Sequence, residues 1–544
     1  MVIRHSTFRS LAFVGLVAAI APAQAGQIGR TLNNSAAIVN NYSMITPGMP
    51  SYGIAQGSIV QIYGTGLTLA TSPLQNVPLP TTLNGTTVNI TINGTTTHAI
   101  LYYVSPTQID AIIPSATPVG TGQITVTVQG AGTGAPAPIT VVQSAFGMLT
   151  LNGVGNGPAV AFDVNSNYLG LTNAANPGDF ITLWGSGVGP VTGDETIAQT
   201  PMNLTNIPIE VDIGGKPSMI QYAGRSIYPG VDQINVQVPP GVSGCHTSVV
   251  VRSGDIVSNF GTIPVASGGR VCAEPDAGLT AGQIQTLISQ PVVNTGAVEF
   301  ATSLPLTSGL AAVAAFKRFT NAQFAAVRPF TTVSFNDCTV YNYRDRSLGL
   351  GNPIQPVPLD AGPSISVSTP SGSGVGNLSI PFQNGAYTDT GLTSSGSLKG
   401  TYTFTAPGGA DIGPFSVQID SLGGGGFRFS TPNNPTSVTR SQGLLLTWNQ
   451  PNNTDPSEFI QIYGFSFVFN YPFGAQFFCY VPLAAGQFTI PPAVLLALPV
   501  QPAGSTAQAT LEVDLVISHP FTAPGADVSR ANFVTATQEV FSYR

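Results

Sequence analysis

Apolar and polar residues alternate over short stretches of this chain. Valine and isoleucine occupy every second position of residues 88–92, and an Asn-Gly pair follows at 93–94. Such alternation buries one face of a strand, and Asn-Gly is the strongest two-residue signal for a tight hairpin. Residues 124–128 alternate in the same way. The pattern predicts short antiparallel strands joined by glycine turns, which is typical of a β-sandwich.

The same pattern occurs twice. The stretch GSIVQIYGTGL begins at 57 and GDFITLWGSGV begins at 178, an offset of 121 (178 − 57) that places Tyr63 on Trp184. The Asn-Gly turn maps at this offset to Gly214-Gly215, whereas the later Gln-Ile-Asp and Gln-Ile-Asn stretches are offset by 125. The sequence therefore predicts two β-sandwiches, at residues 26–146 and 147–268, that arose by duplication.

Two longer stretches carry a family resemblance. NPGDFITLWGSGVGPV at 176–191 and YPGVDQINVQVPPGVSG at 228–244 resemble an uncharacterised immunoglobulin-like domain family that is repeated in secreted proteins of Acidobacteria. The resemblance extends over residues 33–267 and reaches, more distantly, the IPT/TIG branch of immunoglobulin-like folds. It implies tandem sandwiches, and it brings no catalytic residues.

The pattern of short alternating strands stops after residue 268. Residues 280–289 and 309–327 have helix-forming composition, so we expect a linker at 269–330 that contains one or two short helices. Strand-like stretches resume at 331 and continue to the end, which predicts a larger C-terminal β-sandwich at 331–544. This region resembles a second module of secreted acidobacterial proteins that has no assigned activity.

The first residues predict export. Arg4 and Arg9 precede an apolar run, and Ala-Gln-Ala at 23–25 forms a small-residue cleavage site, so residues 1–25 are interpreted as a signal peptide. No later stretch is long and apolar enough to predict a membrane span. Removal of the signal peptide leaves 15 Lys and Arg (17 less two) against 24 Asp and Glu, a net charge of about −9. A mildly acidic chain is a poor partner for nucleic acid, which selects clustered positive charge.

The composition favours an exported β protein with disulfides. Only 8% of the residues are charged, against roughly 25% in ordinary globular proteins, so neutral hydroxyls and amides must solvate the surface. Four cysteines in an oxidising compartment predict two disulfides, with three possible connectivities. We favour Cys245 with Cys272 and Cys338 with Cys479. Metal binding is the rival interpretation, but no C-x-x-C occurs, and we expect neither metal nor cofactor.

Candidate catalytic groups are scattered along the chain. A calcium loop would need an acid at the twelfth position after Asp163, and Ala174 stands there, so the Asx-rich stretch 163–167 predicts a turn. No G-x-S-x-G or H-E-x-x-H motif accompanies the histidines at 98, 246 and 519. Two carboxylates could form a glycosidase pair, and the candidates are Asp411, Asp420, Glu458 and Glu512.

Aromatic residues are the other candidates for ligand contact. Flat rings stack on sugars, and the rings considered are Tyr102, Tyr103, Trp184, Tyr222, Tyr228 and Trp448. A buried tryptophan is ordinary in a sandwich, so the core is the favoured place for Trp184. Trp448 and Asp411 are retained as candidate ligand contacts.

These observations predict a mainly β, non-enzymatic exported protein that binds or scaffolds outside the cell or in its envelope, in adhesion or matrix contact. Its partner would be an extracellular protein or polysaccharide. The alternative is a polysaccharide-binding module or a glycoside hydrolase that acts through the C-terminal region.

Overall fold

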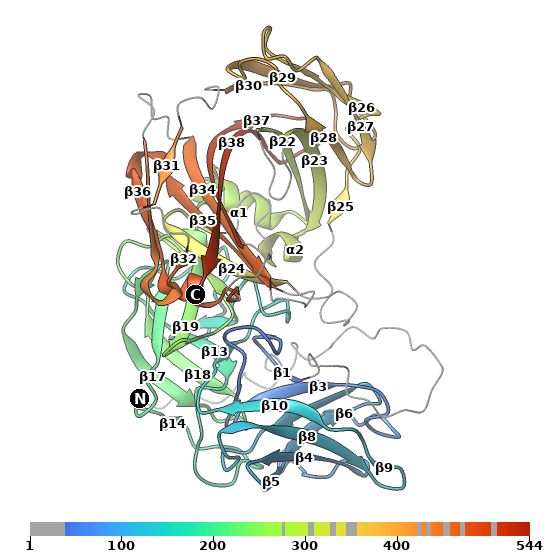
Figure 1. Cartoon of the computed structure of the whole chain (residues 1–544), viewed down its shortest axis with the longest axis vertical. Coiled ribbons are helices and arrows are strands. Elements are labelled where there is room, and N and C mark those ends of the chain that lie inside the picture. Colours follow the sequence, from blue (N-terminus) through green and yellow to red (C-terminus); the bar gives the residue numbers. More distant parts are fainter. Residues whose placement is uncertain are drawn as a thin grey trace.

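The computed structural model describes residues 38–274, 278–302, 309–326, 333–343, 356–421, 427–431, 437–449, 457–467, 474–501 and 509–544. The predicted signal peptide lies outside these residues. The described chain is mainly β, and Figure 1 shows three successive units: the first in blue to cyan, the second in teal to green, and the third in yellow-green to red. No helix in the described part of the chain is long and apolar enough to span a membrane.

The first unit is a sandwich of two sheets with a shared core. One sheet has the order β1 (Ile38–Asn40), β3 (Ile59–Tyr63), β7 (Gln108–Ile112) and β6 (Ile100–Val104). The other has the order β2 (Ile54–Ala55), β10 (Ala137–Val142), β8 (Gly120–Val128), β4 (Thr86–Ile92) and β5 (Thr95–His98), with β9 (Gly132–Thr133) on β8. Asn93 and Gly94 both adopt positive φ between β4 and β5, as the hairpin prediction requires.

The second unit repeats this order. Its first sheet runs β11 (Gly147–Met148), β13 (Phe180–Ser186), β18 (Asp232–Gln237), β17 (Ile220–Arg225) and β14 (Met202–Asn203), with β12 (Ala161–Asp163) on β13. Its second sheet contains β16 (Lys216–Pro217), β15 (Glu210–Ile213), β19 (Gly244–Ser253), β20 (Ile256–Val257) and β21 (Gly261–Val265). The strands β3, β7 and β6 thus correspond to β13, β18 and β17, as expected of a duplicated sandwich.

A 14-stranded sheet dominates the third unit. Its main path is β24 (Asp337–Tyr343), β35 (Gly474–Pro482), β34 (Glu458–Phe467), β37 (Ala509–Phe521), β38 (Val528–Tyr543), β22 (Val292–Ala301), β23 (Leu310–Thr320), β28 (Ala386–Leu392), β27 (Leu378–Gln383), β26 (Ser364–Ser368), β29 (Gly400–Ala406) and β30 (Phe415–Ser421). Two short strands, β25 (Val357–Pro358) and β32 (Ser437–Val438), pair with β23 and β38. The sheet curls back on itself, because Ile419 of β30 and Phe533 of β38 share one buried core.

A separate three-stranded sheet closes the other core of this unit. It consists of β31 (Phe429–Ser430), β33 (Leu444–Trp448) and β36 (Gln487–Ile490), and it packs with the short helix α3 (Pro492–Leu496) against β34 and β37. This arrangement agrees with the predicted C-terminal β architecture.

The helix predictions were half right. Helix α1 (Ala281–Ser289) forms where expected, and Thr280 and Gln283 form a capping box at its start. The predicted helix at 309–327 was wrong, because most of it is strand β23, followed by the short helix α2 (Asn321–Ala326). Its alanine-rich sequence favours a helix locally, but pairing with β22 and β28 overrides that propensity. The expected linker at 269–330 therefore supplies two strands to the large sheet.

Candidate functional site

The four cysteines form the disulfides favoured from the sequence. Cys245 is bonded to Cys272, and Cys338 to Cys479. The second bond joins directly paired residues of β24 and β35. Each disulfide therefore fastens a peripheral segment of the chain to a central strand.

The proposed ligand contact at Trp448 was wrong. Trp448 is only 7% exposed and belongs to the core between the small and large sheets. Its indole N–H donates to the backbone oxygen of Leu483 at 2.8 Å, so its polar atom is already satisfied. Leu444, Leu446 and Trp448 alternate along β33 and all face this core. The residue is structural.

Asp411 also has structural partners. One carboxylate oxygen lies 3.3 Å from the Arg318 guanidinium, and the other accepts the backbone N–H of Asp360 at 3.1 Å. Both oxygens of this half-buried carboxylate are therefore engaged by the protein itself. These contacts hold the 408–413 turn against β23, and they do not favour a ligand-binding role.

The Asx-rich stretch forms the turn that was expected. Asp163 Oδ1 accepts the backbone N–H groups of Asn165 and Asn167, both at 2.9 Å. Burial raises the pKa of Asp163, but these hydrogen bonds and the Arg270 guanidinium lower it further, so the net shift is downward. Arg270 lies 3.4 Å from the other oxygen, where a calcium ion would need open space.

The described histidines also make structural contacts. His98 pairs with Asn89 on adjacent strands at 2.8 Å. His246 lies 2.8 Å from Glu274, and both are buried beside the Cys245–Cys272 disulfide. His519 is half-buried near the end of β37.

The candidate glycosidase carboxylates do not come together. Asp420 is exposed on β30, where Thr401 donates to it. Glu458 is level with Ile517 in the β34–β37 ladder and Glu512 is level with Tyr463, five residues further along β34. Because side chains alternate across a strand, Glu458 and Glu512 lie on opposite faces of the sheet.

A different acidic pair lies on β37, which the sequence reasoning missed. Glu512 and Asp514 are both buried on one face, and their carboxyl groups hydrogen-bond to each other. Burial and repulsion by Glu512 raise the pKa of Asp514 well above its ordinary range. Gln461 donates to Asp514 Oδ2 at 3.0 Å. Acids two residues apart on a strand share a face, which was the available signal.

The first two units meet through a buried ionic junction. Arg225 and Asp232 form an ion pair at 2.9 Å, and both side chains are 0% exposed. The Arg225 guanidinium also donates to the backbone oxygen of Gly57 in the first unit at 2.8 Å. A Cβ at Gly57, which has φ +72°, would lie 2.7 Å from Arg225, so only glycine fits there.

Further polar contacts complete this junction. The Ser115 backbone N–H and hydroxyl donate to the two carboxylate oxygens of Glu195 at 2.7 and 2.9 Å. The Ser186 hydroxyl donates to Gly230 and accepts the backbone N–H of Ile59. Apolar residues from both units surround these bonds. Such a buried and directional interface holds two sandwiches in one relative orientation.

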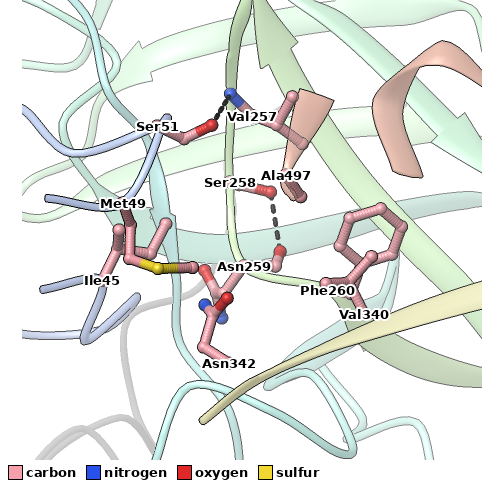
Figure 2. A pocket seen from close by; sticks show the side chains of 10 residues that line it. All are labelled: Ile45, Met49, Ser51, Val257, Ser258, Asn259, Phe260, Val340, Asn342 and Ala497. Atoms are coloured by element: carbon pink, nitrogen blue, oxygen red, sulfur yellow. Dashed lines mark hydrogen bonds between the residues drawn. The ribbon is translucent and has the colours of Figure 1, made fainter. Parts of the chain in front are cut away.

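All three units meet around a small cavity. Figure 2 shows that Met49, Phe260, Val340 and Ala497 approach it from four separate segments of the chain. Only about 10 Å³ of it is open to a water-sized molecule, far below the roughly 300–1,000 Å³ of small-molecule sites. Nearby, Asp337 of β24 accepts the backbone N–H of Ser248 on β19 at 2.6 Å. This cavity is a packing gap at a domain interface.

The buried carboxyl of Asp110 on β7 should make the stability of the protein depend on pH. Burial raises its pKa from 3.8 to about 7. Between pH 4 and 7 the unfolded chain has lost this proton while the folded protein keeps it, so stability falls as pH rises. We expect urea unfolding to show a decrease of about 3–4 kcal/mol from pH 4 to pH 8 from this group. Asp110→Asn should remove that part of the slope, and an unchanged slope would contradict the assignment.

The outer face of the first sheet in the second unit carries aromatic, hydroxyl and amide side chains. Ile181 and Leu183 of β13 point into the core, so Thr182 and Trp184 point outward. Register places Gln233 of β18 beside Trp184 and Asn235 beside Thr182. Trp184 was expected in the core, and that expectation was wrong, because it is half-buried on this outward face.

Aromatic rings border these amides on both sides. Tyr222 of β17 is level with Asn235, and Phe162 of β12 is level with Thr182. The ring of Tyr228 lies 6.3 Å from that of Trp184, and the ring of Tyr168 lies 6.0 Å from that of Phe162. We name this surface the aromatic face, consisting of Phe162, Tyr168, Thr182, Trp184, Tyr222, Tyr228, Gln233 and Asn235.

Comparisons with known proteins identify a domain family for part of the chain. Residues 43–141 match the family model of the IPT/TIG domain. This match covers the first unit and agrees with the immunoglobulin-like sandwich described above. No match was found among curated proteins.

Solved structures give weak likenesses. A Bacteroides ovatus mixed-linkage glucan utilization protein, SGBP-B, in complex with a heptasaccharide has 14% identity and a TM-score of 0.19, and the alignment covers 39% of this chain and 45% of that one. The titin domains A168–A170 have 10% identity and a TM-score of 0.13, over 71% and 94% of the two chains. Domains 5–6 of the S-layer protein SbsC have 14% identity and a TM-score of 0.15, over 44% and 98%. With scores this low, these likenesses carry no argument about function.

Proposed function

We propose that this protein is an exported, non-enzymatic scaffold that presents a binding surface outside the cell or in its envelope. The single observation that carries the proposal is the junction between the first two units. There a fully buried Arg225–Asp232 pair reaches across to Gly57, so two immunoglobulin-like sandwiches form one rigid element. Rigid tandem sandwiches suit spacing and presentation of a ligand.

Export is supported by independent features. Two disulfides form readily only in an oxidising compartment. Residues 1–25 have the pattern of a signal peptide, and residues 33–267 resemble domains of secreted acidobacterial proteins. The low content of charged residues suits a hydroxyl-rich extracellular setting, in which the partner would be a protein or a polysaccharide.

A hydrolase remains the second candidate, and one observation favours it. Glu512 and Asp514 are adjacent buried carboxyls of which one has a strongly raised pKa, and such pairs serve as acid and base in glycosidases. Gln461 and the Tyr480 hydroxyl form a hydrogen-bonded chain to Asp514.

One experiment separates the two candidates. Mature protein from Gly26 is incubated with cell envelopes and with extracted polysaccharides, and both sedimentation and the release of reducing ends are measured. We expect co-sedimentation without release of reducing ends. Release that is abolished by Glu512→Gln with Asp514→Asn, and kept by the exposed control Asp420→Asn, would establish the hydrolase instead. Absence of both sedimentation and release would refute the binding function.

A further inference from the structure

We propose that the aromatic face binds an uncharged polysaccharide, an inference that rests on the proposed binding function and names its ligand class. The face lies on β12, β13, β18 and β17 of the second unit. It is the counterpart of a face that the first unit uses to contact its neighbour.

In the first unit, the equivalent strands β3, β7 and β6 contact the second unit. On β3 and β7, Ile59 and Ile112 contribute to the apolar part of the junction, and Tyr102 of β6 donates to the backbone oxygen of Pro229 in the second unit. The third unit approaches the second through β19, on its other sheet, and through Leu171 and Ala174 in the loop after Tyr168. The ring of Trp184 contacts that of Tyr228, and the Tyr222 hydroxyl donates to the backbone oxygen of Arg225, so both contacts stay within the second unit.

The side chains of the aromatic face suit a neutral hydroxyl-rich polymer. Aromatic rings offer flat apolar area for the C–H faces of sugars, and primary amides both donate and accept hydrogen bonds, as hydroxyl groups require. The Thr182 hydroxyl donates to Asn235 Oδ1 at 3.0 Å, which fixes the orientation of that amide. No intramolecular hydrogen bond engages the Gln233 amide within the described residues.

Charge on this face distinguishes the ligand class. In the described strands, the outward positions of β13, β18 and β17 carry aromatic, aliphatic, hydroxyl and amide side chains and no ionised group. The charged residues nearby are already paired: the buried Arg225 with Asp232, and the partly exposed Arg270 with Asp163 at the end of β12 and Asp179 at the start of β13. A polyanion would find no unpaired cation among these residues, and a charged protein surface would find no unpaired complementary ion. An uncharged glycan requires neither.

The spacing of the rings indicates a chain of sugars. Trp184 and Tyr222 stand on strands separated by β18, so their backbones lie about 10 Å apart or slightly more at the usual strand spacing. A single monosaccharide would touch one of these rings, whereas an oligosaccharide lying across the strands would touch both and the amides between them.

Affinity electrophoresis of the full mature protein tests this inference. Gels would contain a neutral β-glucan, a neutral α-glucan or xylan, with a gel lacking polysaccharide as reference. We expect retardation in at least one neutral polysaccharide, and a loss of affinity of about tenfold or more in Trp184→Ala. Trp184→Tyr should retain most of the binding, because a ring remains. Gln233→Leu should weaken binding without removing any ring.

Tyr103→Ala is the matched control, because Tyr103 is a half-buried tyrosine of β6 in the first unit. Its retardation should equal that of the wild type. Equal retardation of wild type and Trp184→Ala, or no retardation in any neutral polysaccharide, would overturn the inference. A protein ligand that is lost in Trp184→Ala would likewise reassign the face to a protein partner. If envelopes still sediment the protein while glycans do not retard it, the inference fails and the proposed scaffold function stands.

Discussion

Replacing Arg225 with methionine is expected to lower the free energy of unfolding by about 3–5 kcal/mol, because it leaves the buried Asp232 carboxylate without its cation. The substitution also removes the hydrogen bond to Gly57, so the first two units should lose their fixed orientation. Urea unfolding monitored by Trp184 fluorescence in a Trp448→Phe background would measure the loss within the second unit, since the chain contains two tryptophans.

A double variant provides the control for this prediction. Arg225→Met with Asp232→Asn removes both charges but keeps an oxygen for the backbone N–H groups of Gly187 and Val188. It should recover most of the lost stability, because an uncompensated buried charge is the main cost. A loss below about 1 kcal/mol in the single variant would show that solvent reaches Asp232 and that the junction is not a rigid one.

Replacing Cys338 and Cys479 together with alanine should destabilise the third unit by about 5 kcal/mol, according to the chain-entropy estimate for a loop of this length. The two cysteines are 141 residues apart, and β24 is the terminal strand of the main sheet path. Without the bond, β24 is held by its pairing to β35 and by the contact of Asp337 with Ser248, and both should weaken. Thermal unfolding followed by calorimetry would measure the change.

The other disulfide serves as the comparison. Cys245 and Cys272 are only 27 residues apart, so the same estimate gives about 3.5 kcal/mol for the corresponding double alanine variant. The larger loss is therefore expected in the 338/479 variant. The reverse order would show that the loop-closure argument does not describe this protein.

The alternation of side chains along each strand predicts the orientation of both tryptophans correctly. Trp184 is out of phase with the core residues Ile181 and Leu183, whereas Trp448 is in phase with Leu446. Parity alone therefore indicates an outward Trp184 and an inward Trp448, the opposite of the assignments made from the sequence. The general frequency of buried tryptophans was given more weight than the phase of each strand.

Other features could not be predicted locally. Residues 310–320 are rich in alanine, and their strand conformation depends on pairing with β22 and β28, which lie outside this stretch of sequence. The Arg225–Gly57 contact joins residues 168 apart, and nothing near either residue announces it. The repeat, the hairpin at Asn93-Gly94 and the disulfides could be predicted from the sequence. The repeat and the hairpin depend on motifs at recognisable spacings, and the disulfides depend on an even number of cysteines.

The Cys338–Cys479 bond also determines how the chain would respond to mechanical tension. A pulling force applied between the two ends of the chain would pass directly from Cys338 to Cys479 through the covalent bridge. The intervening residues, roughly 500 Å of chain if fully extended, would be shielded from that force. Eight strands of the large sheet, β25 to β30, β32 and β34, lie entirely inside this loop. The bridge would therefore limit how far the protein can lengthen when it is stretched between two attachments.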